Sequence, residues 1–134
     1  MNKEHIFYDY VDQNGANLIK GWLHGDGKSA RARFNLIIDN LEGSPPPGFM
    51  GSVWTPSYVY DLTGDWKGFL EIRAEINKKE YRLIGQRQNR NILLITWGYH
   101  DGKGWHTDIT PGSAKIRVSQ MITNIGKYGR EHEI

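Results

Sequence analysis

Hydrophobic and polar residues alternate with different periods along the chain, and each period predicts a type of element. Residues 69–76 (FLEIRAEI) place apolar side chains at every second position and charged side chains between them. This pattern is typical of a strand with one buried and one wet face. Residues 81–86 are the expected partner strand, and residues 92–97 are apolar enough for the centre of a sheet. The polar segments 77–80 and 88–90 are short enough for hairpin turns.

Helical spacing marks three other segments. In residues 28–41, apolar side chains recur three or four positions apart, and Gly43 followed by three prolines ends the pattern. Residues 16–24 form a shorter expected helix between two glycines. A last helix is expected to begin at Thr110, which can cap it, with Pro111 at its first position, and to end at Gly126.

The remaining segments carry weaker signals. Residues 5–10 are rich in β-branched and aromatic side chains and suit a first strand. Residues 43–66 contain many prolines and glycines, which favour a loop, but Phe49, Met50 and Trp54 are large apolar side chains. We expect this loop to fold back over the core and lead into the sheet. Residues 126–134 are expected to form a flexible tail.

The order of elements is therefore β-α-α-loop-β-β-β-α. It predicts a single α+β domain over residues 1–134, with an N-terminal strand, two helices, an antiparallel sheet of hairpin-linked strands and a C-terminal helix. We expect the helices to cover one face of the sheet. The opposite face, which carries Arg73, would then be free to bind a partner.

Charge is distributed unevenly along this domain. Residues 1–66 hold 5 Lys and Arg against 8 Asp and Glu, whereas residues 67–134 hold 12 against 7. A basic half that is also rich in aromatic residues suits a polyanionic partner, because each phosphate contact releases counterions. A solvated surface with uneven charge explains the same numbers equally well.

Several classes of function are disfavoured by what the chain lacks. There is no cysteine, which excludes disulfides, thiolate metal sites and cysteine nucleophiles, and suits a reducing cytoplasm. The longest apolar run, residues 92–95, is too short to span a bilayer, and no signal peptide is evident, so we expect a cytoplasmic protein that is not bound to membranes.

Motifs for metals and cofactors are also missing. His100 and His106 lie near Asp101 and Asp108, but without a recognised ligand spacing. The glycines around residues 98–104 do not form a phosphate-binding loop, and no nucleophile elbow is present. We therefore expect no metal and no small-molecule cofactor.

Three segments resemble the RelE/HigB toxins, and specifically their phage-associated HigB-like branch: KGFLEIRAEINKKEYRL, NILLITWGYHDGK and ITPGSAKIRVSQM. The matching features are the strand ending in Arg73, the Tyr81-Arg82 pair, the apolar strand ending in Gly98, and the helix opened by Thr110 with Ala114 and Arg117. The N-terminal IFYDYVDQNGANLIKGWL is similar to the family's opening strand and helix.

The resemblance implies a toxin-type endoribonuclease that cuts messenger RNA on the ribosome and is neutralised by a small antitoxin protein. In such a reaction the RNA 2′-hydroxyl attacks the adjacent phosphate, which needs acid–base groups and fixed cations but no metal. Arg73 and Arg82 would contact phosphate oxygens, and we expect both on one solvent-accessible surface. His100 would exchange a proton, and Tyr99 would hydrogen-bond or stack.

Further residues are candidates for holding the RNA. Trp97 and Trp105 could stack on unpaired bases, and Lys79 and Lys103 could contact the backbone. Each assignment has a simpler explanation. Arg73 and Arg82 have glutamates nearby, Trp97 ends an apolar strand and suits the core, and Lys79 suits a solvated hairpin.

The chain also departs from the family pattern. Many relatives carry paired lysines after the glycine, where this chain has Tyr99 and His100, and some carry lysines where it has Phe69 and Glu71. The loop around residues 45–58 is longer than the family needs. A non-catalytic RNA- or protein-binding module on the same fold, such as a phage-encoded inhibitor, is therefore an alternative function.

Overall fold

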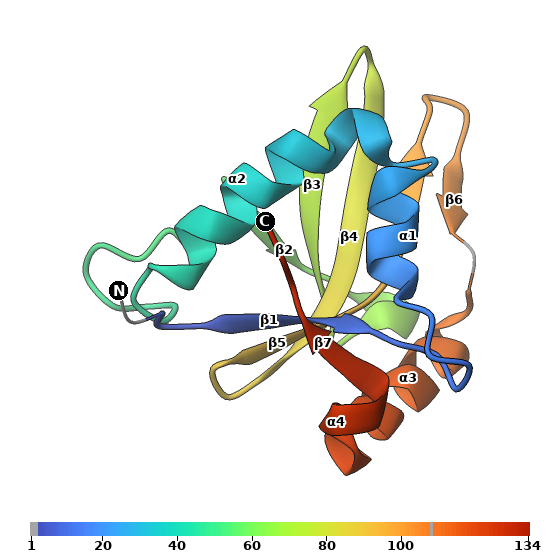
Figure 1. The fold of residues 1–134 in the computed structure, drawn as a ribbon. Helices are drawn as coiled ribbons and strands as arrows, with labels where there is room; N and C mark the ends of the chain where they lie inside the picture. Colours follow the sequence, from blue (N-terminus) through green and yellow to red (C-terminus); the bar gives the residue numbers. More distant parts are fainter. Residues whose placement is uncertain (1–2, 108) are drawn as a thin grey trace.

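The computed structural model describes residues 3–107 and 109–134. The chain forms an α+β fold in which two helices follow the first strand and a mixed sheet precedes the C-terminal helix, consistent with a RelE-like topology (Figure 1). The helices are α1 (Leu18–His24), α2 (Arg31–Glu42), α3 (Pro111–Thr123) and the short α4 (Ile125–Tyr128), with 3-10 turns at Lys28–Ala30 and Gly64–Trp66. None of the helices in the described part of the chain is long and apolar enough to cross a membrane.

The strands are β1 (Ile6–Tyr10), β2 (Val59–Asp61), β3 (Leu70–Ile76), β4 (Lys79–Gln88), β5 (Asn91–His100), β6 (Trp105–Thr107) and β7 (Gly129–Glu131). Their order is β2-β3-β4-β5-β1-β7. The first half of β5 pairs with β1 in parallel, and its last three residues pair with β6 in antiparallel orientation. The predicted hairpins are confirmed, since β3, β4 and β5 are consecutive antiparallel neighbours.

The hairpin between β3 and β4 fixes the register of the functional face. Its turn consists of Asn77 and Lys78, both with positive φ (51° and 68°), which is the conformation of a two-residue type I′ turn. The symmetry of this turn places Arg73 directly opposite Arg82. One β-bulge, between Ile84 and Gly85, interrupts the pairing of β4 with β5.

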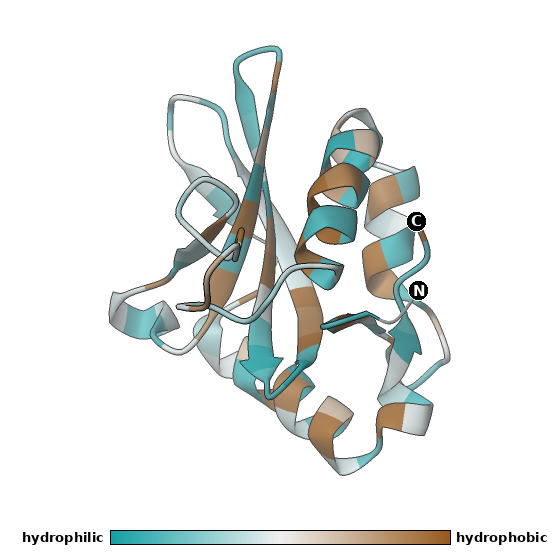
Figure 2. Cartoon of the chain, turned by 90° about the vertical axis from the view of Figure 1, so that its left-hand side faces the viewer, coloured by the Kyte–Doolittle hydropathy of each residue, from teal (hydrophilic) through white to brown (hydrophobic). Residues whose placement is uncertain are grey.

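The helices lie on both faces of the sheet, so the prediction that they cover one face is wrong. α1 and α2 pack on the face that carries Ile72, Leu83 and Leu94. α3 packs on the opposite face, where Ala114, Val118 and Met121 meet Ile84, Leu93 and Ile95. Figure 2 shows α1 and α2 together on one side of the strands, and hydrophobic residues recurring along the helices and strands. The end of the second face near the β3–β4 hairpin carries charged side chains.

The structure departs from the prediction in two segments. The segment after α2 does fold back over the core through Trp54, which is buried, and it contributes β2 to the sheet. However, Phe49 is 65% exposed and Met50 is 98% exposed, so these two side chains remain in water. The segment after Trp97 is not wholly a loop, because β5 continues to His100 and β6 pairs back against it.

The predicted flexible tail is an ordered part of the fold. α3 ends before Gly126, which lies inside α4, and residues 129–131 form β7 against β1. His132 is buried, and its Nδ1 lies 2.7 Å from Asp9 Oδ1 while its Nε2 lies 2.9 Å from Asn35 Oδ1. These partners are far away in sequence, and no local pattern at residues 126–134 encodes them.

Candidate active site

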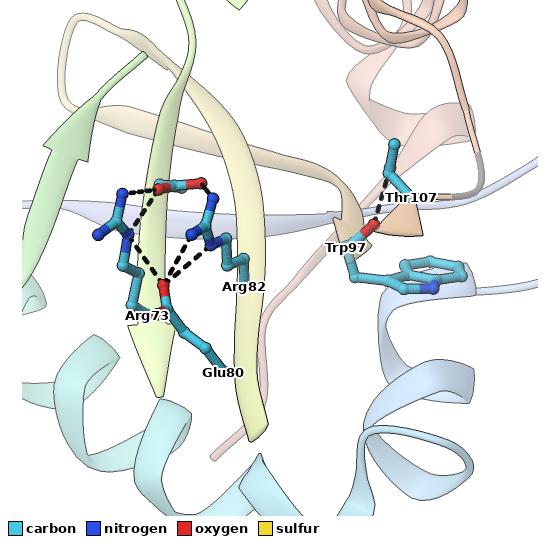
Figure 3. A network of polar contacts seen from close by, with 6 residues as sticks. Arg73, Glu80, Arg82, Trp97 and Thr107 are labelled. Carbon is cyan, nitrogen blue, oxygen red and sulfur yellow. Dashed lines mark hydrogen bonds and ion pairs between the residues drawn. The ribbon is translucent and has the colours of Figure 1, made fainter. Parts of the chain in front are cut away.

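Four charged side chains form one cluster on the second face of the sheet, which we call the charged cluster: Glu71, Arg73, Glu80 and Arg82. Because Arg73 and Arg82 are cross-strand partners, both guanidinium groups point to this face, as predicted. Their side chains are 34% and 19% exposed. Figure 3 shows Arg73, Glu80 and Arg82 converging, with the ring of Trp97 lying apart from them.

Each carboxylate of the cluster contacts both arginines. Arg73 Nε donates a 2.6 Å hydrogen bond to Glu71 Oε1 and lies 3.3 Å from Glu80 Oε1. Arg82 Nε donates to Glu80 Oε1 at 3.0 Å, and Arg82 Nη1 lies 3.5 Å from Glu71 Oε2. Glu71 is 1% exposed, and its burial is compatible with charge because both of its oxygens contact a guanidinium. The pairing of the arginines with glutamates, anticipated as the simpler explanation, is therefore present.

Aromatic rings flank the charged cluster on both sides. The Arg73 guanidinium lies 3.8 Å from the centre of the Tyr60 ring, and the Arg82 guanidinium lies 4.6 Å from that of Trp105. Trp105 reaches this position by packing on Gly98, where an added Cβ would come within 2.5 Å of the Trp105 ring. A glycine at position 98 is thus needed for the Trp105 ring to approach the backbone of β5 this closely. These contacts hold each arginine between a carboxylate and a ring face, which restricts its rotamers.

His100 joins the same face, because it is the cross-strand partner of Glu80. Its Nδ1 accepts a 3.1 Å hydrogen bond from the backbone N–H of Gly102. The neutral ring therefore carries its proton on Nε2, which is the atom left to donate to a ligand. Glu80 contacts its partners among the described residues through Oε1, so Oε2 is the atom available to accept a proton.

The other candidate residues, apart from Trp105, lie away from the charged cluster, and the structure does not bring them together with Arg73 and Arg82. Tyr99 and Trp97 point to the face covered by α1, where Trp97 stacks on Trp22 at 5.6 Å. Lys79 Nζ lies 3.9 Å from the centre of the Tyr99 ring. Lys103 is exposed in the turn after β5.

That turn is held by local contacts. The backbone N–H of Lys103 donates to Asp101 and lowers the pKa of the Asp101 carboxyl, with a further contribution from His106, whose Nε2 lies 3.3 Å from it. Asp108, which the sequence places near these side chains, lies outside the described residues. Within residues 3–107 and 109–134, no group of three or more His, Cys, Asp or Glu side chains is arranged to hold a metal ion.

Comparison with known proteins gives no further assignment: no family model, no curated protein and no solved structure matches the chain. Sequence reasoning treated Glu71 and Glu80 only as neighbours of the arginines, although the alternation in residues 70–76 already placed Glu71 and Arg73 on one face. Tyr60 carried no signal, because β2 is short and lies in a segment without clear periodicity.

Proposed function

We propose that the chain is a metal-independent endoribonuclease whose active site consists of Arg73, Glu80, Arg82 and His100. The observation that carries the proposal is the position of the Glu80 carboxylate, between two arginines and opposite His100. A carboxylate base, fixed cations and an imidazole donor on one surface are the groups that RNA cleavage by its own 2′-hydroxyl requires.

In the proposed reaction, Glu80 Oε2 accepts the proton of the RNA 2′-hydroxyl as that oxygen attacks the adjacent phosphorus. The bond from phosphorus to the 5′-oxygen breaks, and the leaving oxygen takes a proton from His100 Nε2 or from water. The products are a 2′,3′-cyclic phosphate and a free 5′-hydroxyl. Arg73 and Arg82 stabilise the charge on the phosphorane, for which the guanidinium fork is well suited.

The finer proposal is a toxin that cuts messenger RNA on the ribosome and is held inactive by a small antitoxin protein. It is supported by the sequence resemblance to the RelE/HigB toxins and by an order of elements that is consistent with a RelE-like topology. The cytoplasmic location, where both messenger RNA and ribosomes are found, is part of the same proposal.

A second function is favoured by one observation. The two arginines of the charged cluster are matched by two glutamates, so the cluster has no net charge, and a phosphate must compete with carboxylates already in place. A module that binds RNA or protein without cleaving it would tolerate this arrangement. Measurement of both RNA cleavage and RNA binding distinguishes an endoribonuclease from a module that only binds.

The test incubates the purified chain with messenger RNA, with and without bacterial ribosomes, and identifies the ends of the products. EDTA is added only to reactions without ribosomes, because ribosomes dissociate when Mg²⁺ is chelated. We expect cyclic phosphate ends, no cleavage of a 2′-deoxy substrate, and loss of rate by about 100- to 10000-fold in Glu80→Gln. Glu133→Gln, an exposed glutamate distant in sequence from the cluster, is the matched control. Unchanged activity in Glu80→Gln would overturn the mechanism. RNA binding without cleavage by the unaltered chain would favour the binding module.

A further inference from the structure

A cavity of about 560 Å³ lies between α1 and the ends of β4, β5 and β6, apart from the charged cluster. Its walls include six aromatic or imidazole rings: Trp22, Tyr81, Trp97, Tyr99, Trp105 and His106. Its polar side chains include Lys79, at the start of β4, and Asp26, just after α1. A volume of this size matches the pockets that proteins use for small organic ligands.

The walls suit a flat aromatic ligand. Trp22 and Trp97 stack on each other at 5.6 Å with an angle of 14° between their planes, and Tyr99 and His106 stack at 4.7 Å and 24°. Each pair fixes the orientation of its rings, and a planar guest would lie against the ring surfaces that the partner ring does not cover. Stacking on an aromatic side chain favours binding of any base, because every base has a π-face.

Lys79 and Asp26, the two charged side chains of the cavity, can select among planar ligands by their polar groups. The Lys79 ammonium is positioned by the rings of Tyr99 and Tyr81, whose centres lie 3.9 and 5.0 Å away, and can contact a phosphate. Asp26 presents a carboxylate, which accepts hydrogen bonds and donates none. Among the RNA bases, guanine has two adjacent N–H donors on its pairing edge, and these match the two oxygens of one carboxylate.

We propose that this cavity is a guanine nucleotide subsite, with the base stacked in the aromatic walls, Asp26 accepting from the base and Lys79 contacting its phosphate. The inference rests on the proposed function in taking RNA as the natural ligand. Trp105 connects the two places, because it lines the cavity and also covers Arg82 of the charged cluster. An RNA strand cleaved at the cluster would therefore have a neighbouring guanine held on the other side of β6.

The test titrates the full chain with 5′-GMP, 5′-AMP, 5′-CMP and 5′-UMP while recording tryptophan fluorescence, since three of the five tryptophans line the cavity. We expect saturable quenching by GMP, with an affinity at least about tenfold higher than for UMP, the pyrimidine with one N–H donor on that edge. Asp26→Asn and Lys79→Ala should each weaken GMP binding about tenfold. Asp65→Asn and Lys78→Ala are the matched controls, because both residues are exposed and outside the cavity.

The outcomes separate this inference from the proposed ribonuclease. Binding of GMP that Asp26→Asn and Lys79→Ala weaken, and that Asp65→Asn and Lys78→Ala leave intact, would support the subsite even if no RNA were cleaved. Absence of quenching, equal affinity for all four nucleotides, or full binding by both cavity variants would overturn it, even if the chain cleaved RNA. Circular dichroism and a thermal melt of each variant exclude unfolding as the cause of lost binding.

Discussion

Arg73 and Arg82 face each other across β3 and β4 and share a single carboxylate oxygen, Oε1 of Glu80. Two like charges in adjacent positions would repel each other, so their closeness depends on the glutamates between them. The charged cluster thus contributes to the stability of the fold and also forms the proposed active site.

Removal of the Glu71 charge should destabilise the fold. Glu71→Ala leaves two guanidinium groups facing each other with one carboxylate fewer, and breaking a buried ion pair costs about 3–5 kcal/mol. Because both arginines are partly exposed, we expect the lower end of this range. Urea denaturation measures the change. Glu133→Ala should alter stability by less than about 0.5 kcal/mol, and an equally small effect of Glu71→Ala would contradict the importance of the cluster.

Gly98→Ala should displace Trp105 from Arg82. The added methyl would lie 2.5 Å from both the Trp105 ring and the backbone oxygen of His106, and such overpacking typically costs about 1–3 kcal/mol. Gly104→Ala is the control, since a Cβ there meets no atom within 4 Å. The melting temperature and the RNA cleavage rate should both fall in Gly98→Ala and should not change in Gly104→Ala. Wild-type values for that variant would show that Trp105 does not need the glycine.

His132 should anchor the C-terminal segment. His132→Ala removes the hydrogen bonds to Asp9 and Asn35 and leaves a buried carboxylate with fewer partners, at a cost of about 2–3 kcal/mol. Amide hydrogen exchange should accelerate in β1 and β7, which pair with each other. His24→Ala, at an exposed histidine, serves as the comparison. Unchanged exchange in β7 would indicate that the strand pairing alone holds the segment.

Stability should fall in mild acid because of His5. Burial, and then the charge of Arg87, lowers the pKa of His5 below its ordinary 6.5. The unfolded chain therefore binds a proton at a higher pH than the folded chain does. The stabilising contribution is complete above about pH 6.5 and is lost as the pH falls toward the folded-state pKa. His5→Phe should flatten the dependence of melting temperature on pH between about 7.5 and 5.5. Parallel curves for the two proteins would contradict this cause.

Expression in bacteria should arrest growth, and Arg82→Ala should relieve the arrest more completely than His100→Ala. Arg82 contacts both glutamates and Trp105, and removal of one donor that stabilises transition-state charge costs about 100- to 1000-fold. A proton donor such as His100 can be replaced in part by water. Colony counts after induction, with cleavage sites mapped by primer extension and soluble protein compared for each variant, provide the measurement. Normal growth with intact messages would remove the toxin assignment.

The sequence by itself determined the local elements and one part of the site. The alternation in residues 70–76, the polar hairpin segment 77–80, in which the structure places a turn at Asn77 and Lys78, and the capping of α3 by Thr110 are local signals, because each depends on residues a few positions apart. From the strand period and the hairpin it follows that Arg73 and Arg82 share a face. Their nearest charged partners, Glu71 and Glu80, lie two positions away on the same strands, so these pairings were also foreseeable.

Only the tertiary structure decided the rest. The pairing of β7 with β1 joins segments about 120 residues apart, and the end of β5, up to His100, is held between β4 and β6. That extension matters for the site, since successive residues of a strand point to opposite faces, and it separates His100 from Tyr99. The position of α3 on the second face depends on an apolar surface assembled from three strands. Such long-range contacts position residues that belong to no local pattern. The sequence alone therefore could not place these residues.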